Sequence, residues 1–160
     1  NAQAPMGVPM PLDLVGRIAR EIPGTWYVKE EVPPCGARIT ALLRDHGSHL
    51  QGVFSGWGGI HLVDELARGA CGCMPSAAFV KPQAQIYEAF KRGNLDEARK
   101  LHARLLPLIV LRGQYGNTMA KLVLQWLGVF THTTVRDPQA IWPDEYDVRE
   151  MERLLKEWDG

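Results

Sequence analysis

The stretch Thr25–Glu31 carries an amine and a carboxylate at a spacing that could let them act together. It is rich in aromatic and β-branched residues, and proline and glycine flank it, which predicts a short β-strand. Side chains alternate across a strand, so Tyr27, Lys29 and Glu31 share one face. We expect Lys29 to close this strand, and in α/β proteins the carboxyl ends of strands are where sites are built.

Two interpretations of Lys29 follow from this position. Desolvation disfavours the ammonium form of an amine, and a neutral amine can attack a ketone to form a Schiff base. Alternatively, Lys29 is an edge residue that forms an ion pair with Glu30 or Glu31. On this stretch alone the ion pair is the simpler interpretation.

A glycine-rich turn follows the next predicted strand, which spans residues 50–55. The turn, Gly56-Trp57-Gly58-Gly59, does not complete the G-x-G-x-x-G pattern of dinucleotide sites. Its glycines would allow backbone amides to approach a ligand carboxylate closely. A plain tight turn explains the same residues equally well.

The cysteines and histidines do not indicate a metal centre. Cys71 and Cys73 lie two residues apart in a predicted third strand, which spans residues 70–74, and provide too few ligands for zinc. We therefore expect buried free thiols rather than a metal site or a disulfide. The five histidines form no H-x-x-H or H-E-x-x-H pattern, so we assign no metal.

Composition limits the class of protein. The 160 residues are 46% hydrophobic and 22% charged, as in ordinary globular domains. Eighteen basic residues balance 18 acidic ones, which gives no support to nucleic acid or an anionic membrane as a partner. No apolar run reaches the roughly 18 residues needed to span a bilayer, and no signal-peptide pattern opens the chain. We therefore expect a cytoplasmic protein.

Apolar periodicity places helices around these strands. The expected helices begin near Pro11, Pro34, Ile60, Pro82, Leu95, Thr118 and Pro143, and Pro107 should kink the fifth of them. Helices and strands alternate over the first half, which predicts parallel strands with right-handed crossovers. Three strands cannot close a barrel, so the chain is either a small open sheet or part of something larger.

Along its whole length the chain resembles the C-terminal part of the dihydrodipicolinate synthase and N-acetylneuraminate lyase family. The resemblance rests on segments that occur in the family's order. They are the opening Asn1–Gly7 (Y-N-x-P-x-x-x-G without its first residue), Tyr27–Glu30 (the Schiff-base strand), Phe54–Gly56 (the S-G turn), Arg68–Gly72 (the G-A-x-G strand), Gly93–Ala98 (G-[DN]-x-x-x-A), and Lys121, Gly128 and Val135–Pro138.

Departures from the family pattern point to one branch. Tyr27 and Glu31 replace the small residues usual two before and two after the lysine, and the opening is one residue longer before Pro5. With Met74-Pro75 after the third strand, these features look more like sugar-acid dehydratases such as the 2-keto-3-deoxyarabonate dehydratases. A carboxylate on the lysine's face could act as general acid or base on a substrate hydroxyl.

The resemblance implies an α/β fold that is the C-terminal half of a (β/α)₈ TIM barrel followed by a C-terminal helical extension. Residues 1–80 would supply barrel strands and helices, and residues 81–160 the last barrel helix and the helical region. The implied function is a class I lyase that dehydrates a 2-keto-3-deoxy sugar acid through an imine on Lys29. No cofactor is expected besides this covalent imine.

By the same resemblance, Glu31 is the candidate proton-transfer group, and Ser55, Gly56, Gly58 and Gly59 are candidate substrate contacts. The expected partners are a small 2-keto acid such as pyruvate, a complementary N-terminal half-barrel, and further copies in a family-type tetramer. Two alternatives stay open. One is an aldolase, synthase or deaminase of the same family, and the other is a non-catalytic truncated half-barrel.

Overall fold

The computed structural model describes residues 1–3, 5, 7–24 and 26–159, so Thr25 of the predicted strand lies outside the described residues. The elements in chain order are α1 (Leu12–Glu21), β1 (Tyr27–Glu30), α2 (Cys35–His46), η1 (Gly47–His49), β2 (Gly52–Ser55), η2 (Trp57–Gly59), α3 (Leu62–Ala67), β3 (Gly72–Cys73), η3 (Ala77–Phe79), α4 (Val80–Lys91), α5 (Leu95–Tyr115), α6 (Asn117–Trp126) and α7 (Glu145–Asp159).

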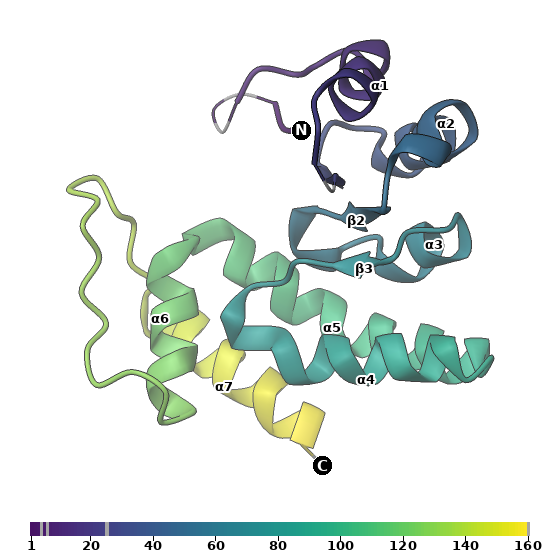
Figure 1. Cartoon of the computed structure of the whole chain (residues 1–160). Helices are drawn as coiled ribbons and strands as arrows, with labels where there is room; N and C mark the ends of the chain where they lie inside the picture. Colours follow the sequence, from purple (N-terminus) through teal and green to yellow (C-terminus); the bar gives the residue numbers. More distant parts are fainter. Residues whose placement is uncertain (4, 6, 25, 160) are drawn as a thin grey trace. The chain divides into compact units, whose positions relative to one another are not determined.

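The described residues divide into two compact units, Asn1–Pro75 and Ser76–Gly160. The first unit holds a three-stranded parallel sheet in the order β1-β2-β3 (Figure 1). Lys29 is in register with Phe54, and Glu30 is in register with Ser55. Ala2 adds a parallel bridge to Glu31 on the other side of β1. The predicted alternation of helices and parallel strands is confirmed.

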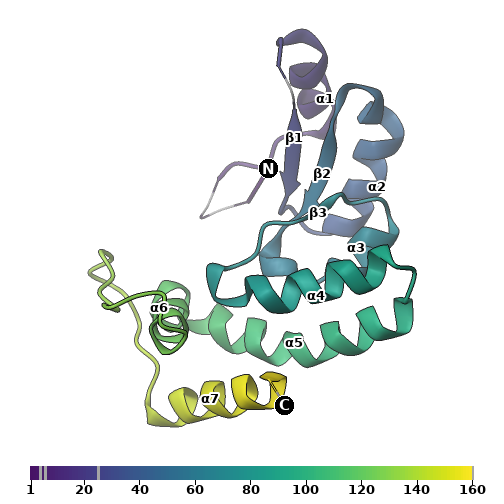
Figure 2. The ribbon, with the colours of Figure 1, turned by 60° about the horizontal axis from the view of Figure 1, so that its bottom comes forward.

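Helices cover one face of this sheet. α2 packs on β1 and β2, α3 packs on β2 and β3, and α1 packs on α2 (Figure 2). The apolar cluster beneath them consists of Val15, Val28, Ile39, Leu42, Val53 and Ala70. Because Val28 points into this cluster, the alternation of the strand turns Lys29 to the opposite face. The core thus fixes which face of β1 carries the amine.

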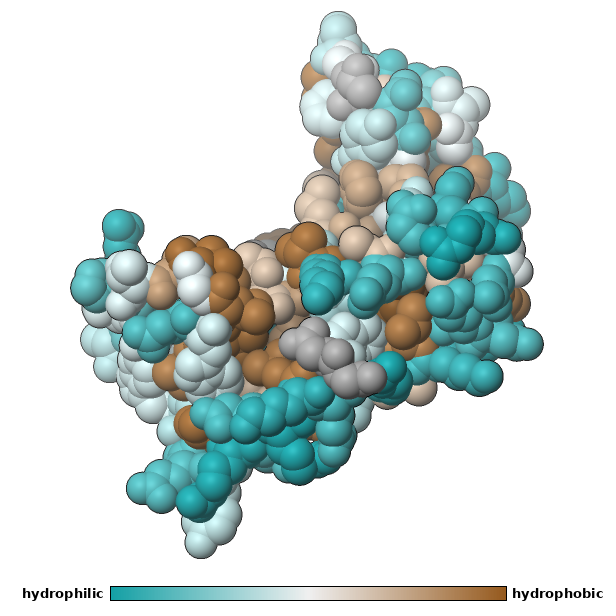
Figure 3. Space-filling view, turned by 90° about the horizontal axis from the view of Figure 1, so that it is seen from below, coloured by the Kyte–Doolittle hydropathy of each residue, from teal (hydrophilic) through white to brown (hydrophobic). Residues whose placement is uncertain are grey.

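The second unit is helical. α5 packs against α4, α6 and α7, and fully buried side chains including Ile86, Leu105 and Met151 form its core. The segment between α6 and α7 exposes large apolar residues such as Val129 and Ile141. Figure 3 shows apolar surface in brown beside charged surface in teal. Large exposed apolar areas are typical of surfaces that become covered in an assembly.

Several details differ from the sequence-based expectations. The strands are shorter than expected, and α5 continues past Pro107 as far as Tyr115. Packing along both sides of a long helix outweighs the one hydrogen bond that proline removes.

Cys35 is buried as a free thiol, but Cys71 and Cys73, expected to be buried, are only half-buried. The expected division at residue 80 concerns roles within a barrel and stays a prediction. In the described part of the chain, no helix is long and apolar enough to cross a membrane.

Candidate active site

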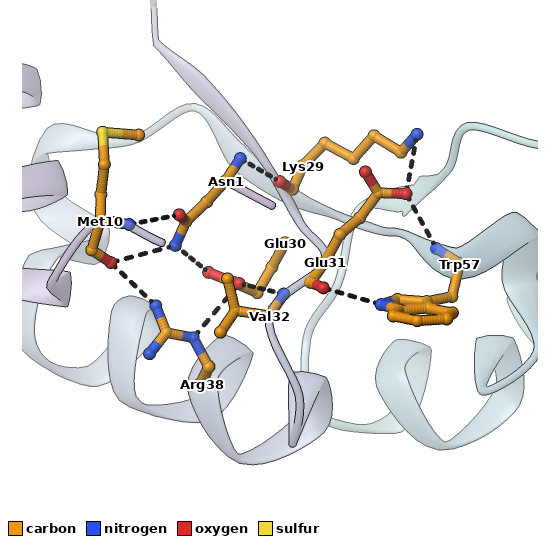
Figure 4. Close-up of polar contacts among 8 residues, drawn as sticks. All are labelled: Asn1, Met10, Lys29, Glu30, Glu31, Val32, Arg38 and Trp57. Atoms are coloured by element: carbon orange, nitrogen blue, oxygen red, sulfur yellow. Dashed lines mark hydrogen bonds and ion pairs between the residues drawn. The ribbon is translucent and has the colours of Figure 1, made fainter. Parts of the chain in front are cut away.

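Lys29 and Glu31 lie together at the carboxyl end of β1. Lys29 Nζ is 3.1 Å from Glu31 Oε1, and the two side chains are 33% and 16% exposed (Figure 4). The predicted shared face is therefore confirmed. The contact satisfies the ion-pair interpretation of Lys29, and it is also within the reach that a proton transfer between the two groups requires.

Trp57 holds Glu31 from the end of the neighbouring strand. Its backbone N–H donates to Glu31 Oε1 at 3.1 Å, and its indole Nε1–H donates to the Glu31 carbonyl oxygen at 2.7 Å. On the other side, the Glu31 N–H donates to the carbonyl oxygen of Asn1 at 2.8 Å. The backbone and the side chain of Glu31 are thus both fixed.

The turn at Gly56 requires glycine for lack of space. A Cβ on Gly56 would lie 2.1 Å from Glu31 Cγ and 2.5 Å from the Glu30 carbonyl oxygen. The next three residues take positive φ angles of 50°, 65° and 83°, at Trp57, Gly58 and Gly59. For a bulky residue such as Trp57 this conformation is strained.

The predicted amide-rich turn therefore exists, but two of its amides donate hydrogen bonds to groups of the protein itself. The Trp57 amide binds the Glu31 carboxylate, and the Gly59 amide donates to the Gly56 carbonyl oxygen at 2.9 Å. The roles of Gly56, Gly58 and Gly59 as substrate contacts stay predictions. What the structure adds is that the carboxylate on this turn is that of Glu31.

Glu30, on the opposite face of β1, is fully buried, and three polar groups surround its carboxylate. Its carboxylate accepts hydrogen bonds from the Val32 N–H at 2.8 Å and from Asn1 Nδ2 at 3.0 Å, and Arg38 Nε lies 3.2 Å away. Asn1 and Arg38 are both tied to Met10 as well (Figure 4). The sequence identified Glu30 only as a possible partner for Lys29.

Ser55, a predicted substrate contact, is not brought to Lys29. It is in register with Glu30 and completely buried. Burial raises the pKa of the neighbouring Glu65 carboxyl, and the Ser55 hydroxyl opposes that shift, although the two form no hydrogen bond of ordinary geometry. Its side chain therefore lies away from the amine, and a contact with substrate stays a prediction.

A mainly apolar cavity of about 190 Å³ lies along β1, lined in part by Val15, Trp26 and Val28. Lys29 is among its lining residues, but Glu31 and the Gly56 turn are not. It therefore does not unite the candidate site residues, and the open face that carries Lys29 and Glu31 is the better candidate.

Burial raises the pKa of each of the three cysteine thiols. Burial raises the pKa values of Cys35 and Cys73 to about 11, so both are neutral thiols near pH 7. Over residues 1–3, 5, 7–24 and 26–159, no group of three or more His, Cys, Asp or Glu side chains could hold a metal ion.

Sequence reasoning missed the part played by Trp57. Its position between Gly56 and Gly58 attracted attention only as part of a turn. A tryptophan within a run of glycines, one strand away from a lysine, was the available signal. The positive φ and the bond to the Glu31 carbonyl oxygen could not be read from spacing.

Comparisons with known proteins agree with the resemblance. A model of the dihydrodipicolinate synthetase family matches residues 1–157. An L-2-keto-3-deoxyarabonate dehydratase from Azospirillum brasilense is 31% identical over 133 residues, which is 82% of this chain and 43% of that protein. A 4-hydroxy-tetrahydrodipicolinate synthase from Bifidobacterium longum is 38% identical over 95 residues, 57% of this chain and 31% of that protein.

The fold agrees as well. A dihydrodipicolinate synthase structure from Rhodopseudomonas palustris superposes with a TM-score of 0.88 at 25% identity, over 98% of this chain and 53% of that one. The chain thus spans about half the length, or less, of the relatives it matches. Because the family model covers nearly all of the chain and the α/β structure matches part of a family fold, this chain belongs to the dihydrodipicolinate synthetase family.

Proposed function

We propose that this chain supplies the Schiff-base half of a class I lyase that dehydrates a 2-keto-3-deoxy sugar acid. In this proposal the chain is the C-terminal half of a (β/α)₈ barrel with a C-terminal helical extension. It works together with a polypeptide that provides the N-terminal half, and we call this assembly the completed barrel. One observation carries the proposal: the 3.1 Å contact between Lys29 Nζ and Glu31 Oε1 at the carboxyl end of a parallel strand.

Lys29 begins the reaction. Its ammonium gives a proton to Glu31, and the neutral amine attacks the C2 carbonyl of the substrate. The carbinolamine that forms takes the same proton back from Glu31 on its hydroxyl group, which leaves as water, so that a protonated imine and a Glu31 carboxylate remain. This imine withdraws electrons from C3 and makes the C3 hydrogens acidic, which is the purpose of the covalent bond.

Glu31 then moves one proton. As a carboxylate it removes a proton from C3, which forms an enamine. The enamine expels the C4 hydroxyl group, and Glu31 returns the proton to that oxygen, so water leaves and a conjugated imine remains. Hydrolysis of this imine releases the product and restores Lys29. The proton count balances without a cofactor.

The comparisons support this reaction over its alternatives only in part. The Azospirillum relative is described as a dehydratase, and the Bifidobacterium relative as a synthase. Glu31 favours the dehydratase, because C3 deprotonation and hydroxyl departure both need a proton carrier near the imine. An aldolase would instead break the bond between C3 and C4. A non-catalytic half-barrel would use neither group.

Reductive trapping tests the proposal. The completed barrel is mixed with pyruvate or a 2-keto-3-deoxy sugar acid, treated with borohydride and digested for mass spectrometry. We expect the added mass on Lys29. Mass on Lys81, on Lys121 or on no lysine contradicts the assignment. Release of a three-carbon keto acid instead of a dehydrated product identifies the aldolase alternative.

A further inference from the structure

We infer that Trp57 is a positioning residue, which holds the Glu31 carboxylate in place for proton transfer. The inference rests on the proposed function of Lys29 and Glu31 and adds a residue to it. Trp57 touches Glu31 at two points, through the backbone amide to Oε1 and through the indole to the carbonyl oxygen.

The two oxygens of the Glu31 carboxylate have different contacts. Lys29 Nζ and the Trp57 amide both approach Oε1, at 3.1 Å each. Oε2 takes part in neither contact and points away from Trp57 (Figure 4). One oxygen is thus anchored, and the other is presented on the face that carries the amine.

The backbone of the turn is strained in a way that serves this contact. Trp57 has a φ of 50°, a left-handed conformation that is unfavourable for a bulky side chain. Such strain persists only where surrounding contacts enforce it, and here the two bonds to Glu31 are those contacts. The indole is 42% exposed, so burial of the ring does not explain the conformation.

Gly56 completes the arrangement. Glu31 Cγ occupies the space that a Cβ on Gly56 would need, at 2.1 Å, and the Glu30 carbonyl oxygen lies 2.5 Å from the same point. A backbone oxygen cannot move aside as a flexible side chain can. An alanine here must therefore displace Glu31 or the turn that holds it.

The test is a double-mutant cycle in the completed barrel. Trp57→Phe keeps the ring and the backbone amide but removes the indole donor. We expect kcat for dehydration to fall about tenfold, the value of one hydrogen bond, with KM within twofold and Lys29 trapping retained. In the Glu31→Gln background the same change should have an effect below twofold, because Trp57 acts through Glu31.

Matched controls separate this role from general damage. Trp26→Phe removes an indole bond of nearly the same length, 2.8 Å to the Ile22 carbonyl oxygen, and should leave kcat unchanged. Gly56→Ala should lower kcat at least as much as Trp57→Phe, while Gly47→Ala, with nothing within 4 Å of its Cβ, should not.

The outcomes distinguish the positioning role of Trp57 from the proposed function of Lys29 and Glu31. Equal losses from Trp57→Phe in both backgrounds, or none in either, overturn the positioning role while trapping at Lys29 keeps the proposed function intact. A wild-type completed barrel that traps no keto acid on Lys29 overturns the proposed function and the positioning role together. A loss seen only when Glu31 is present supports both.

Discussion

The two faces of β1 hold adjacent carboxylates in opposite situations. Glu30 is fully buried, with two hydrogen bonds and a guanidinium on its carboxylate, and Glu31 is 16% exposed and shares its carboxylate with Lys29 and Trp57. The contacts of the Glu30 carboxylate all tie it into the interior of the protein. The Glu31 carboxylate lies partly open beside an amine, with which it could exchange protons. The difference teaches that burial and partners, more than residue type, separate structural from reactive acids.

The sharpest way to break this comparison is to remove the amine. Lys29→Ala should abolish turnover and imine trapping, because it removes the amine on which the proposed imine forms. The fold should survive, since the Lys29 side chain is one-third exposed. Borohydride trapping and a thermal melt of the completed barrel measure the two effects. Residual trapping at another lysine would show that the reactive face lies elsewhere.

The next largest effect concerns the proton carrier. Glu31→Gln should lower dehydration by about 10²–10⁴-fold and leave trapping at Lys29 in place. Single-turnover kinetics beside trapping yields separates the two steps. If both fall together, Glu31 positions the amine and transfers no proton. If neither changes, the dehydratase proposal loses its main support.

A substitution on the opposite face of β1 should change the free energy of unfolding. Glu30→Ala leaves the Arg38 guanidinium without its partner and should cost about 3–5 kcal/mol, measured by urea unfolding. Glu21→Ala breaks an exposed pair with Arg17 and should leave the free energy of unfolding nearly unchanged. A Glu30→Ala variant as stable as wild type would mean that the buried network is not a structural support.

A smaller, pH-dependent effect belongs to Glu65. Burial raises the pKa of this carboxyl above its ordinary value of 4.5, so the folded state keeps a proton that the unfolded state releases. The free energy of unfolding should therefore fall as pH rises from 4.5 through the folded pKa. Glu65→Gln should remove this slope and raise the melting temperature at pH 8 but not at pH 4. Asp96→Asn, at an exposed carboxylate of α5, should change neither.

The fold could be predicted from the sequence because its main signals are local. These signals are the spacing of apolar residues and the positions of proline and glycine. The period of two places Val28 and Lys29 on opposite faces of the strand, and the structure adds that the face of Val28 is the one that packs into the core. The shared face of Lys29 and Glu31 followed in the same way. Strand lengths could not, because pairing across strands decides where a ladder ends.

The site was predicted less completely, since its contacts join distant segments. Asn1 meets Glu30 and Trp57 meets Glu31, across 29 and 26 residues. The glycine turn was expected to present amides to a ligand, and the structure shows its Trp57 amide on a protein carboxylate. The S-G resemblance did not indicate which face of the sheet Ser55 occupies, and its register with Glu30 puts it on the buried side.

The pairing of Asn1 with Glu30 has a consequence for chemical ageing. Asn1 Nδ2 donates to Glu30 Oε2 at 3.0 Å, and Asn1 Oδ1 accepts from the Met10 N–H at 2.8 Å. Deamidation would replace the donor with a second carboxylate facing the first, and like charges at that distance repel. Loss of one ammonia molecule would thus turn an attraction beside Glu30 into a repulsion and weaken the contacts that hold the start of the chain against β1.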